Sequence, residues 1–352
     1  MIRRIAADDP RWAAYVAAHP AATAYHLPGW ISVLRRAYRF GDASLALERA
    51  DGTLAGVLPL MARRGRLTGG RLRSLPVVGS GGPLAGSVED EASLVAAAAE
   101  LGQAEGLVTW IRSRTPGLDA LAPAVRSTAT PPSWVLAVPD DPAGWLRARP
   151  ARLRRGIRRA AKDGVTVEPA TSEDELRAFY ALYVETMRRH RFAPRAWAQL
   201  AGAREHLGDA FVLLLARRAG RVIAGGVFHV VGTSVELLYN ASDPAALDHR
   251  PNHALYAHVV EDAAARGLRA FDFGVAWPGS SLAEFKAQWG AVETPEYLYT
   301  DGPGPAPVPA GEALPAAPAG DQGVKDRLVD AAWDRVPPRL LATGSAFALR
   351  NL

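Results

Sequence analysis

The sequence contains no cysteine, which excludes disulfide bonds, thiolate catalysis and cysteine-ligated zinc. It also lacks any uninterrupted apolar run near the roughly 20 residues that a membrane-spanning helix needs. Its first residues, MIRRIAADDPRW, have no apolar segment of the kind found in secretory signal peptides. Together these absences predict a soluble, cytoplasmic protein.

The common catalytic motifs are missing as well. We find no GxxxxGK[ST] phosphate loop, no HExxH, no GxSxG and no GxGxxG after a predicted strand, so no metal or resident cofactor is expected. The nearest glycine-rich stretch is LPVVGSGGPLAG, residues 75–86. Its backbone N–H groups suit an anion, but a turn between two strands requires glycine equally.

What the chain does have is length, apolar content and positive charge. Its 352 residues are 49% hydrophobic and 22% charged, which suits a globular protein with two domains of ordinary size. The net charge of +5 favours a polyanionic partner such as a nucleic acid, a nucleotide or a membrane surface. Codon bias in a GC-rich genome would produce the same excess of arginine, so both interpretations stay open.

Two sequence patterns occur twice at nearly the same spacing. Residues 45–60 and 213–228 each predict two apolar strands joined by a turn that contains glycine. Residues 104–114 and 265–274 each predict a helix that ends at glycine and passes directly into a strand. Corresponding glycines are 169 residues apart in the first pair (225 − 56) and 161 in the second (267 − 106). These offsets predict a duplicated α/β or α+β fold.

The duplication also divides the chain. We predict an N-terminal domain over residues 1–146 and a C-terminal domain over residues 147–300, which begins with a basic helix. Residues 301–320 are rich in proline and alanine and are expected to form a semi-extended linker. Residues 321–352 are expected to form an amphipathic tail, which either docks on the protein or contacts a membrane surface.

Several of these motifs, in this order, resemble one family. The run FDFG followed by SLAEFKAQWGA, the PNHALYAHVV segment, the basic LRRGIRRAAKDG segment and the LAGVLPL hairpin are similar to the FemABX-like proteins of the GNAT superfamily. The similarity extends from about residue 26 to residue 299. It implies an α/β fold with mixed α+β sheets, two tandem GNAT-like acyltransferase domains, and amide formation on a small amine acceptor.

Two departures from the family pattern concern the fold and the donor. FemA-type members carry a long helical-hairpin arm in the second domain, and no charged helix pair of that kind is visible here. Members that use acetyl-CoA carry [RQ]xxGx[GA] before a helix, where backbone amides bind the pyrophosphate. The corresponding residues 240–256 contain no glycine. Aminoacyl-tRNA is therefore the expected co-substrate, and acetyl-CoA or another acyl-CoA is disfavoured.

Lys286 and Asp272 are the predicted catalytic residues. Lys286 lies between Phe285 and Trp289 after the FDFG strand, where a cation in a dry pocket would stabilise an oxyanion. The resemblance implies that this Phe-Lys pair lies close to the aminoacyl ester. The alternative is a helix whose lysine reaches solvent over buried aromatic rings. Asp272 lies mid-strand, either as a base or amine-orienting group, or as a partner of an arginine or a helix end.

A second group is expected to contact substrate. Tyr239, Asn240 and Ser242 lie where a strand meets a loop, a common place for such contacts. The resemblance implies that Arg189 binds a phosphate or carboxylate of the acceptor. His253 is expected to begin a helix rather than to act as a base. The complete substrate-binding set is Phe285, Trp289, Tyr239, Asn240, Ser242, Tyr256, Arg189 and Trp30.

The predicted basic helix carries positive side chains with no acid before Asp163. We expect it to follow the backbone of a tRNA or nucleotide, or else to be a solvated surface. The residues predicted to bind phosphate are Arg154, Arg155, Arg158 and Arg159.

Three functions are compatible with these features. The first is an amide-forming acyl or aminoacyl transferase that uses aminoacyl-tRNA and an amine acceptor from a cell-wall peptide or a natural-product or envelope intermediate. The second is an acyl-CoA-dependent N-acyltransferase. The third belongs to a different class and is a non-catalytic tandem domain that binds an envelope intermediate.

Overall fold

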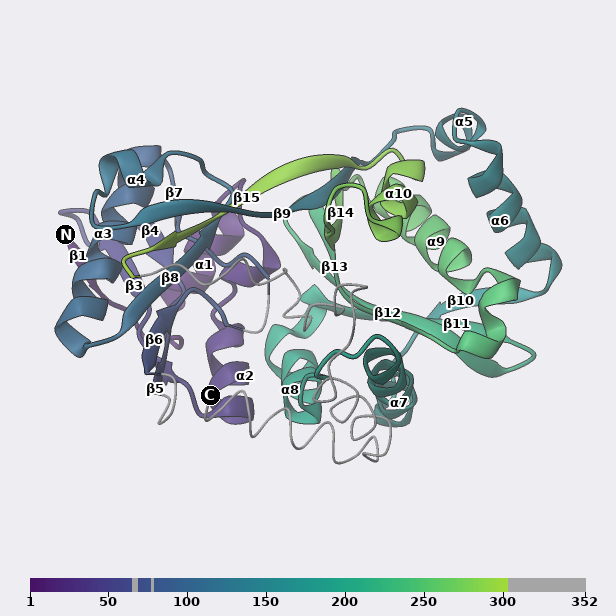
Figure 1. Ribbon diagram of the computed structural model, residues 1–352, viewed down its shortest axis with the longest axis horizontal. Coiled ribbons are helices and arrows are strands. Elements are labelled where there is room, and N and C mark those ends of the chain that lie inside the picture. Colours follow the sequence, from purple (N-terminus) through teal and green to yellow (C-terminus); the bar gives the residue numbers. More distant parts are fainter. Residues whose placement is uncertain (65–68, 77–78, 303–352) are drawn as a thin grey trace, which may run out of the picture.

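A computed structural model describes residues 1–64, 69–76 and 79–302. The predicted tail, residues 321–352, and all but the first two residues of the predicted linker, residues 301–320, lie outside the described residues. Figure 1 shows the two halves of the chain side by side. Two long strands, β9 (Arg126–Ala137) and β15 (Val292–Thr300), run from one half to the other.

The first half combines helices of varied length, among them the 18-residue α3, with short strands. Its helices are α1 (Pro10–Ala18), η1 (Ala24–His26), α2 (Gly29–Tyr38), α3 (Val88–Glu105) and α4 (Leu118–Leu121). Its strands before β9 are β1 (Ile2–Arg4), β2 (Gly41–Asp42), β3 (Leu45–Glu48), β4 (Leu54–Leu58), β5 (Met61–Arg64), β6 (Gly70–Arg73), β7 (Leu84–Ala85) and β8 (Val108–Ser113).

The second half has longer elements. Its helices are α5 (Pro142–Arg147), α6 (Ala151–Lys162), α7 (Glu173–Arg189), α8 (Trp197–Leu207), η2 (Gly208–Ala210), η3 (Pro244–His249), α9 (Pro251–Ala265) and α10 (Ser281–Gln288). Its strands before β15 are β10 (Val165–Pro169), β11 (Phe211–Arg218), β12 (Arg221–Val231), β13 (Ser234–Ser242) and β14 (Ala270–Val275).

The predicted duplication is confirmed in both of its parts. The strands β3 and β4 form one antiparallel hairpin and β11 and β12 the other. Gly52 and Gly220 lie in the two turns with φ of +82° and +76°, a left-handed conformation that favours glycine. Gly106 and Gly267 follow α3 and α9 with φ of +67° and +69°, and β8 and β14 come next. Within the described residues no long helical-hairpin arm is present, in agreement with the prediction.

The strands form a small sheet and a large one. The four-stranded sheet has the order β1-β3-β4-β7 and belongs to the first half. The 11-stranded sheet has the order β10-β11-β12-β13-β14-β9-β15-β8-β6-β5-β2 and passes through both halves. Most neighbours are antiparallel, while β13–β14 and β6–β8 are parallel. The fold is thus of the predicted α/β class with mixed sheets.

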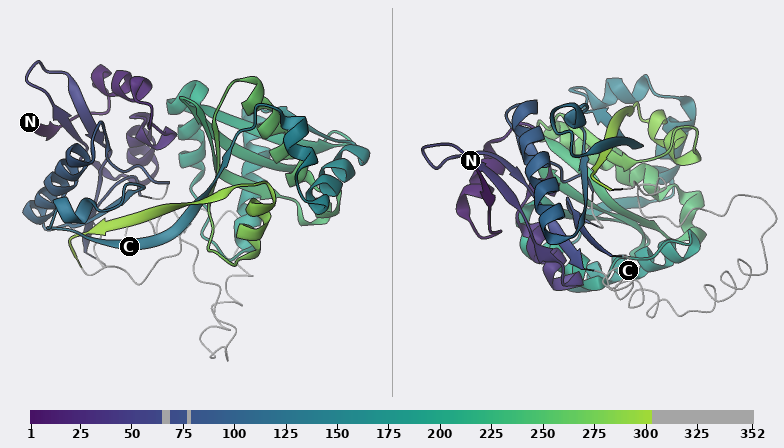
Figure 2. Two further views of the ribbon diagram at one scale, coloured as in Figure 1. Left: turned by 90° about the horizontal axis from the view of Figure 1, so that it is seen from above. Right: turned by 60° about the vertical axis from the view of Figure 1, so that its left-hand side comes forward.

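Continuity of the large sheet depends on β9 and β15. β15 pairs with β8 from the first half and with β9, and β9 pairs in turn with β14 of the second half. Figure 2 shows the yellow-green β15 running beside the blue β9 across the molecule. The hydrogen-bonded sheet therefore crosses the boundary that the sequence predicts at residue 147.

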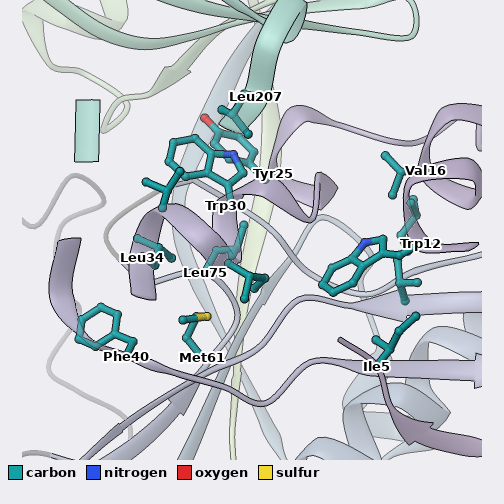
Figure 3. Close-up of a cluster of buried hydrophobic side chains, with 14 of the residues drawn as sticks. Ile5, Trp12, Val16, Tyr25, Trp30, Leu34, Phe40, Met61, Leu75 and Leu207 are labelled. Atoms are coloured by element: carbon teal, nitrogen blue, oxygen red, sulfur yellow. The ribbon is translucent and has the colours of Figure 1, made fainter. Parts of the chain in front are cut away.

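The two halves also meet through side chains. One apolar cluster contains Trp12 and Trp30 of the first half together with Leu207 of α8. Figure 3 shows Leu207 beside Trp30 and Tyr25, at the edge of this cluster. Burial of apolar surface contributes roughly 25 cal/mol per Å², so this cluster helps to hold the two halves together.

The parallel pair β13–β14 separates partway along its length. The two strands are paired only over residues 234–236 and 270–272. Beyond this point β13 has a register shift against β12, which leaves Leu238 without a partner strand residue. A bulge of this kind bends the strand and re-aims its side chains. The separation opens the sheet on the side where α10 begins.

Candidate active site

Asp272 lies at the last position of β14 that is paired with β13, beside this opening. Its side chain is buried, with the residue 6% exposed. One carboxylate oxygen accepts hydrogen bonds from Ser133 Oγ at 2.5 Å and from the Gly274 N–H at 2.7 Å. The other accepts from the guanidinium of Arg114 at the end of the first half's β8. Of the roles considered for Asp272, the structure shows a partner of an arginine, which makes burial of the charge tolerable.

Arg114 joins several acidic groups. Besides Asp272 it contacts Glu296 of β15, with Arg114 Nε 3.4 Å from the carboxylate. Ser80 Oγ donates to the other oxygen of Glu296 at 2.5 Å. Glu296 is 3% exposed, whereas one third of the Arg114 side chain is exposed. The network therefore reaches from a buried position to the surface, and its arginine comes from one half and its acids from the other.

Lys286 lies on α10, which begins with Ser280 as a side-chain cap. The residue is 4% exposed, which excludes the alternative in which the lysine reaches solvent. Its Nζ donates to the backbone carbonyls of Gly274 and Val275, each at 2.8 Å. Burial lowers the pKa of the Lys286 ammonium to about 8, against the opposing effect of the Asp272 charge. The cation is thus fixed at the end of β14, where β13 and β14 separate.

Aromatic rings pack around the base of α10. Trp289 is fully buried, and its ring centroid lies 6.3 Å from that of Phe285 and 5.9 Å from that of Tyr256. Tyr256, on α9, also contacts Phe273 of β14 at 5.3 Å. Phe285, Trp289 and Tyr256 are therefore brought together with Lys286, as predicted positions of one site.

The residues at the end of β13 that are predicted to contact substrate form hydrogen bonds with residues other than Lys286. Ser242 Oγ donates to Asn252 Oδ1 at 2.9 Å, and Asn240 Nδ2 donates to the same atom at 3.3 Å. Tyr239, which follows the bulge, accepts at its hydroxyl from Gln199 Nε2 at 2.6 Å. These groups hold the start of α9 and the helix α8 against β13. Whether they also contact substrate stays a prediction.

Three other predicted residues make mainly internal contacts. Arg189 Nη1 lies 3.5 Å from the carbonyl oxygen of Ser242. Trp30 is fully buried, with its ring centroid 5.4 Å from that of His229. The ring of His253 packs edge-on to Phe285 at 5.5 Å. Burial lowers the pKa of His253 to about 4, so its imidazole is neutral and packs as a helix-start residue.

The basic helix is present as α6 and packs against α9. Leu153 and Ala160 face the core, while Arg155 and Arg158 are exposed and form no ion pair with a described residue. Arg159 pairs with Asp163 at 2.8 Å, and Arg154 is half-buried. Gly156 is required by this contact, because an added Cβ would lie 2.3 Å from the ring of His253.

In the segment that would bind the pyrophosphate of CoA, backbone N–H groups form hydrogen bonds within the segment's own turns. The backbone N–H of Ala245 donates to Asp243 Oδ1 at 2.9 Å, and that of Ala246 donates to the Asp243 carbonyl at 3.0 Å. Arg250 N–H donates to Leu247 O at 3.0 Å, and His253 N–H donates to Arg250 O at 2.9 Å. Donors bound in this way are not directed at a ligand.

The glycine-rich loop is explained by close packing. An added Cβ would lie 2.2 Å from the Tyr25 ring at Gly79 and 2.2 Å from the Arg112 carbonyl oxygen at Gly82. At Gly81 it would lie 2.5 Å from the Leu75 side chain. Of the two interpretations of this stretch, the structure favours glycine required by the turn.

Sequence reasoning missed several residues of the site. Glu236 of β13 is 3% exposed and accepts a hydrogen bond from the Ala24 N–H at 3.3 Å. Arg114, Glu296 and Ser133 were also not selected. Glu236 carries the same signal that identified Asp272, a carboxylate inside an apolar strand. The others come from distant parts of the chain, and only the folded sheet brings them together.

Metal-binding clusters and membrane-spanning helices are both absent from the described residues. No group of three or more histidine or acidic side chains is arranged to hold a metal ion. No helix there is both long and apolar enough to span a bilayer.

Comparisons with known proteins show a family likeness for the second half of the chain and a shared fold for most of it. Residues 147–287 match the family model of the acetyltransferase (GNAT) domain. Residues 147–287 are therefore similar to GNAT domains, and the GNAT resemblance drawn from the sequence motifs is confirmed at this level. No curated protein matches the sequence significantly.

Several solved structures are similar in fold to most of the chain. FemX has 17% sequence identity and a TM-score of 0.66, with 85% of this chain and 96% of FemX covered. The C-terminal domain of a putative lysylphosphatidylglycerol synthetase from Agrobacterium fabrum has 15% identity and a TM-score of 0.57, covering 83% and 90%. L-PGS from Bacillus licheniformis has 12% identity and a TM-score of 0.58, covering 97% and 100%. At these identities the likeness shows the fold, which this chain shares with FemX.

Proposed function

We propose that the chain is an aminoacyltransferase that takes an amino acid from aminoacyl-tRNA and forms an amide with a primary amine. The observation that carries this proposal is the buried ammonium of Lys286, fixed at the opening between β13 and β14. An ammonium has three N–H donors. The carbonyls of Gly274 and Val275 take two of them, and the third is left to meet an oxyanion.

The reaction needs one such donor and a correctly placed amine. The neutral amine attacks the ester carbonyl carbon, and the tetrahedral oxyanion is stabilised by Lys286. The carbon–oxygen bond to the tRNA ribose then breaks, the ribose oxygen takes the proton that the attacking nitrogen loses, and an amide remains. Asp272, held by Arg114, Ser133 and Gly274, orients the incoming amine through its negative charge.

Two observations favour a tRNA donor over acyl-CoA. Four turn N–H groups between Asp243 and His253 are bonded within their own segment, which withdraws donors that a CoA pyrophosphate would use. The exposed Arg155 and Arg158 of α6 offer positive charge to a phosphate backbone. For the acceptor, the FemABX resemblance supports an amine of a cell-wall peptide or of a natural-product or envelope intermediate in the cytoplasm.

Donor binding tests this proposal directly. We expect purified protein to bind charged tRNA in fluorescence anisotropy at low salt and to show no micromolar binding of acetyl-CoA in calorimetry. Micromolar binding of acetyl-CoA without binding of charged tRNA would establish the acyl-CoA alternative instead. The non-catalytic alternative would be established by two results together. An envelope intermediate would bind equally well with and without the Lys286 side chain, and neither donor would support transfer.

The salt dependence identifies the surface that holds the tRNA. We expect the double variant Arg155→Glu and Arg158→Glu to weaken tRNA binding and to reduce the slope of log K against log salt by about two. Arg126→Glu, an exposed arginine at the start of β9, is the matched control. Equal slopes for the double variant and the control would remove α6 from the tRNA surface.

A further inference from the structure

Three polar side chains form a row across the middle of the large sheet. His229 of β12 is the register partner of Glu236 of β13, and Glu236 is the register partner of Asp272 of β14. Side chains at paired positions of neighbouring strands point to the same face of a sheet. Their shared face is the one covered by the first half, since the Ala24 N–H bonds to Glu236 and Trp30 contacts His229.

Three carboxyl groups, those of Glu236, Asp272 and Glu296, lie around this row, and Arg114 and Lys286 are the cations that act on Asp272. Arg114 contacts both Asp272 and Glu296, whereas Glu236 has no cationic partner within hydrogen-bonding distance among the described residues. Burial and the nearby charge of Asp272 raise the pKa of Glu236 to about 8, and Arg114 only partly offsets this effect. The Tyr25 hydroxyl on η1 faces the same acids, and its pKa is raised by burial and by Glu236.

His229, the second unusual residue of the row, is a buried histidine whose ring nitrogens lack hydrogen-bond partners in the described part of the chain. It is fully buried, and neither ring nitrogen has a hydrogen-bond partner in the described part of the chain. Trp30 Nε1, next to it, is also without a partner there. Burial lowers the pKa of His229 to about 3, so the imidazole is neutral and one ring nitrogen is a free acceptor. Buried polar groups without partners are rare and call for a ligand or water.

We infer that the row of His229, Glu236 and Asp272 is a binding site for the primary ammonium group of a substrate. An ammonium supplies a cationic partner for the Glu236 carboxylate and three N–H donors for carboxylate and imidazole acceptors. A metal ion fits less well, because no described group of acidic and histidine side chains has the arrangement of a metal site.

This inference rests on the proposed function, in which both substrates carry an amine. The acceptor has a primary amine, and the transferred amino acid has an α-ammonium. The row lies at the last paired positions before β13 and β14 separate. The partly exposed side chain of Arg114 marks the side from which a substrate reaches it. On binding, protonated Glu236 releases its proton to solvent and becomes the carboxylate partner of the ammonium.

Carboxyl NMR of the full chain tests the site without any turnover. Glutamate is labelled with ¹³C at the side-chain carboxyl, and the Glu236 signal is assigned by its loss in Glu236→Gln. We expect its pKa in sodium chloride to fall by about one unit when ethylammonium chloride replaces the salt at equal ionic strength. Ethanol, the neutral analogue of ethylammonium, should leave the pKa of Glu236 unchanged. An unchanged pKa in ethylammonium would overturn the inference.

Kinetics with Glu236→Gln identify which substrate carries the ammonium. We expect KM to rise about tenfold for that substrate, the equivalent of about one pKa unit of charge interaction, with a smaller change in kcat. A raised KM for the amine assigns the site to the acceptor, and a raised KM for aminoacyl-tRNA assigns it to the donor. A fall in kcat with both KM values unchanged would contradict ammonium binding. Glu261→Gln, an exposed carboxylate on α9, is the control.

The two proposals fail in different ways. A lowered Glu236 pKa without transfer from aminoacyl-tRNA would reject the proposed donor and leave the ammonium site standing. Transfer from aminoacyl-tRNA with an unmoved Glu236 pKa would reject the ammonium site alone.

Discussion

At the scale of single residues, Lys286 combines a buried charge with a defined direction. Its aliphatic chain is enclosed by the protein, while its Nζ is held by two backbone carbonyls at the end of β14. An ammonium held in this way needs no reorganisation when negative charge develops on a substrate. Preorganised donors of this kind contribute most of the electrostatic stabilisation in many enzymes.

Replacing the ammonium while keeping the chain length tests this role. We expect Lys286→Met to lower kcat about 100-fold or more, the loss seen when one oxyanion donor is removed. Acceptor binding, measured by calorimetry, should stay within a few-fold of the original. Glu284→Gln, an exposed substitution on the same helix, should retain full activity, and a fully active Lys286→Met would remove the lysine from the mechanism.

The lowered pKa of Lys286 also predicts a pH limit. Burial brings this pKa from 10.5 down to about 8, so the ammonium is present below that pH and lost above it. We expect kcat to decline as the pH rises through about 8. The residual activity of Lys286→Met should lack this decline, and the same decline in both proteins would assign it to another group.

At the scale of elements, the contact between α6 and α9 depends on one glycine. A Cβ at Gly156 would meet the ring of His253, and that ring is held by Phe285. In an unhindered helix interior, alanine is more favourable than glycine by roughly 0.5–1 kcal/mol. Here the clash reverses the sign, because forcing extra atoms into a packed contact costs about 1–3 kcal/mol.

We therefore expect Gly156→Ala to lower the free energy of unfolding in urea by about 1–2 kcal/mol net. Gly86→Ala is the matched control, since no atom lies within 4 Å of a Cβ added at Gly86. A Gly156→Ala protein as stable as the original would show that α6 moves away from α9 without cost.

Elements with a regular pattern could be predicted from the sequence, and irregular ones could not. The alternation and turn glycines around Gly52 and Gly220 predict the two hairpins. The long strand β9 was not predicted, because Pro131 and Pro132 lie inside it. Proline is rare within strands, and here both prolines fall at the register shift between β9 and β15.

The candidate site was predictable only in part, for a related reason. Lys286 and Asp272 could be selected because each is a charged residue beside aromatic or apolar neighbours along the chain. The arginine that pairs with Asp272 is 158 positions away. The row of His229, Glu236 and Asp272 is created by strand register. Periodicity within one segment contains no information about that register.

At the scale of the whole molecule, the crossing strands make each half dependent on the other. β15 comes last among the described strands, yet it pairs with β8 of the first half. Removing it exposes the edges of both β8 and β9, and unpaired edges favour aggregation. The halves are therefore expected to unfold together.

Two truncations test this dependence. We expect a chain that ends at residue 302, which keeps all of β15, to show a cooperative melting transition. A chain that ends at residue 291 should lose the tertiary signal of both halves and elute as aggregate in size-exclusion chromatography. A monomeric 1–291 protein with a cooperative melting transition would show that the first half folds without β15.

The same strand order determines when the first half can complete its sheet during synthesis on the ribosome. The last residue of β8 precedes the last residue of β15 by 187 positions (300 − 113). At a translation rate of about 5–20 residues per second, the edge of β8 stays unpaired with β15 for roughly 10–40 s. During that interval the nascent first half is an unfinished sheet, and a chaperone or a pause in translation would act on it before the second half exists.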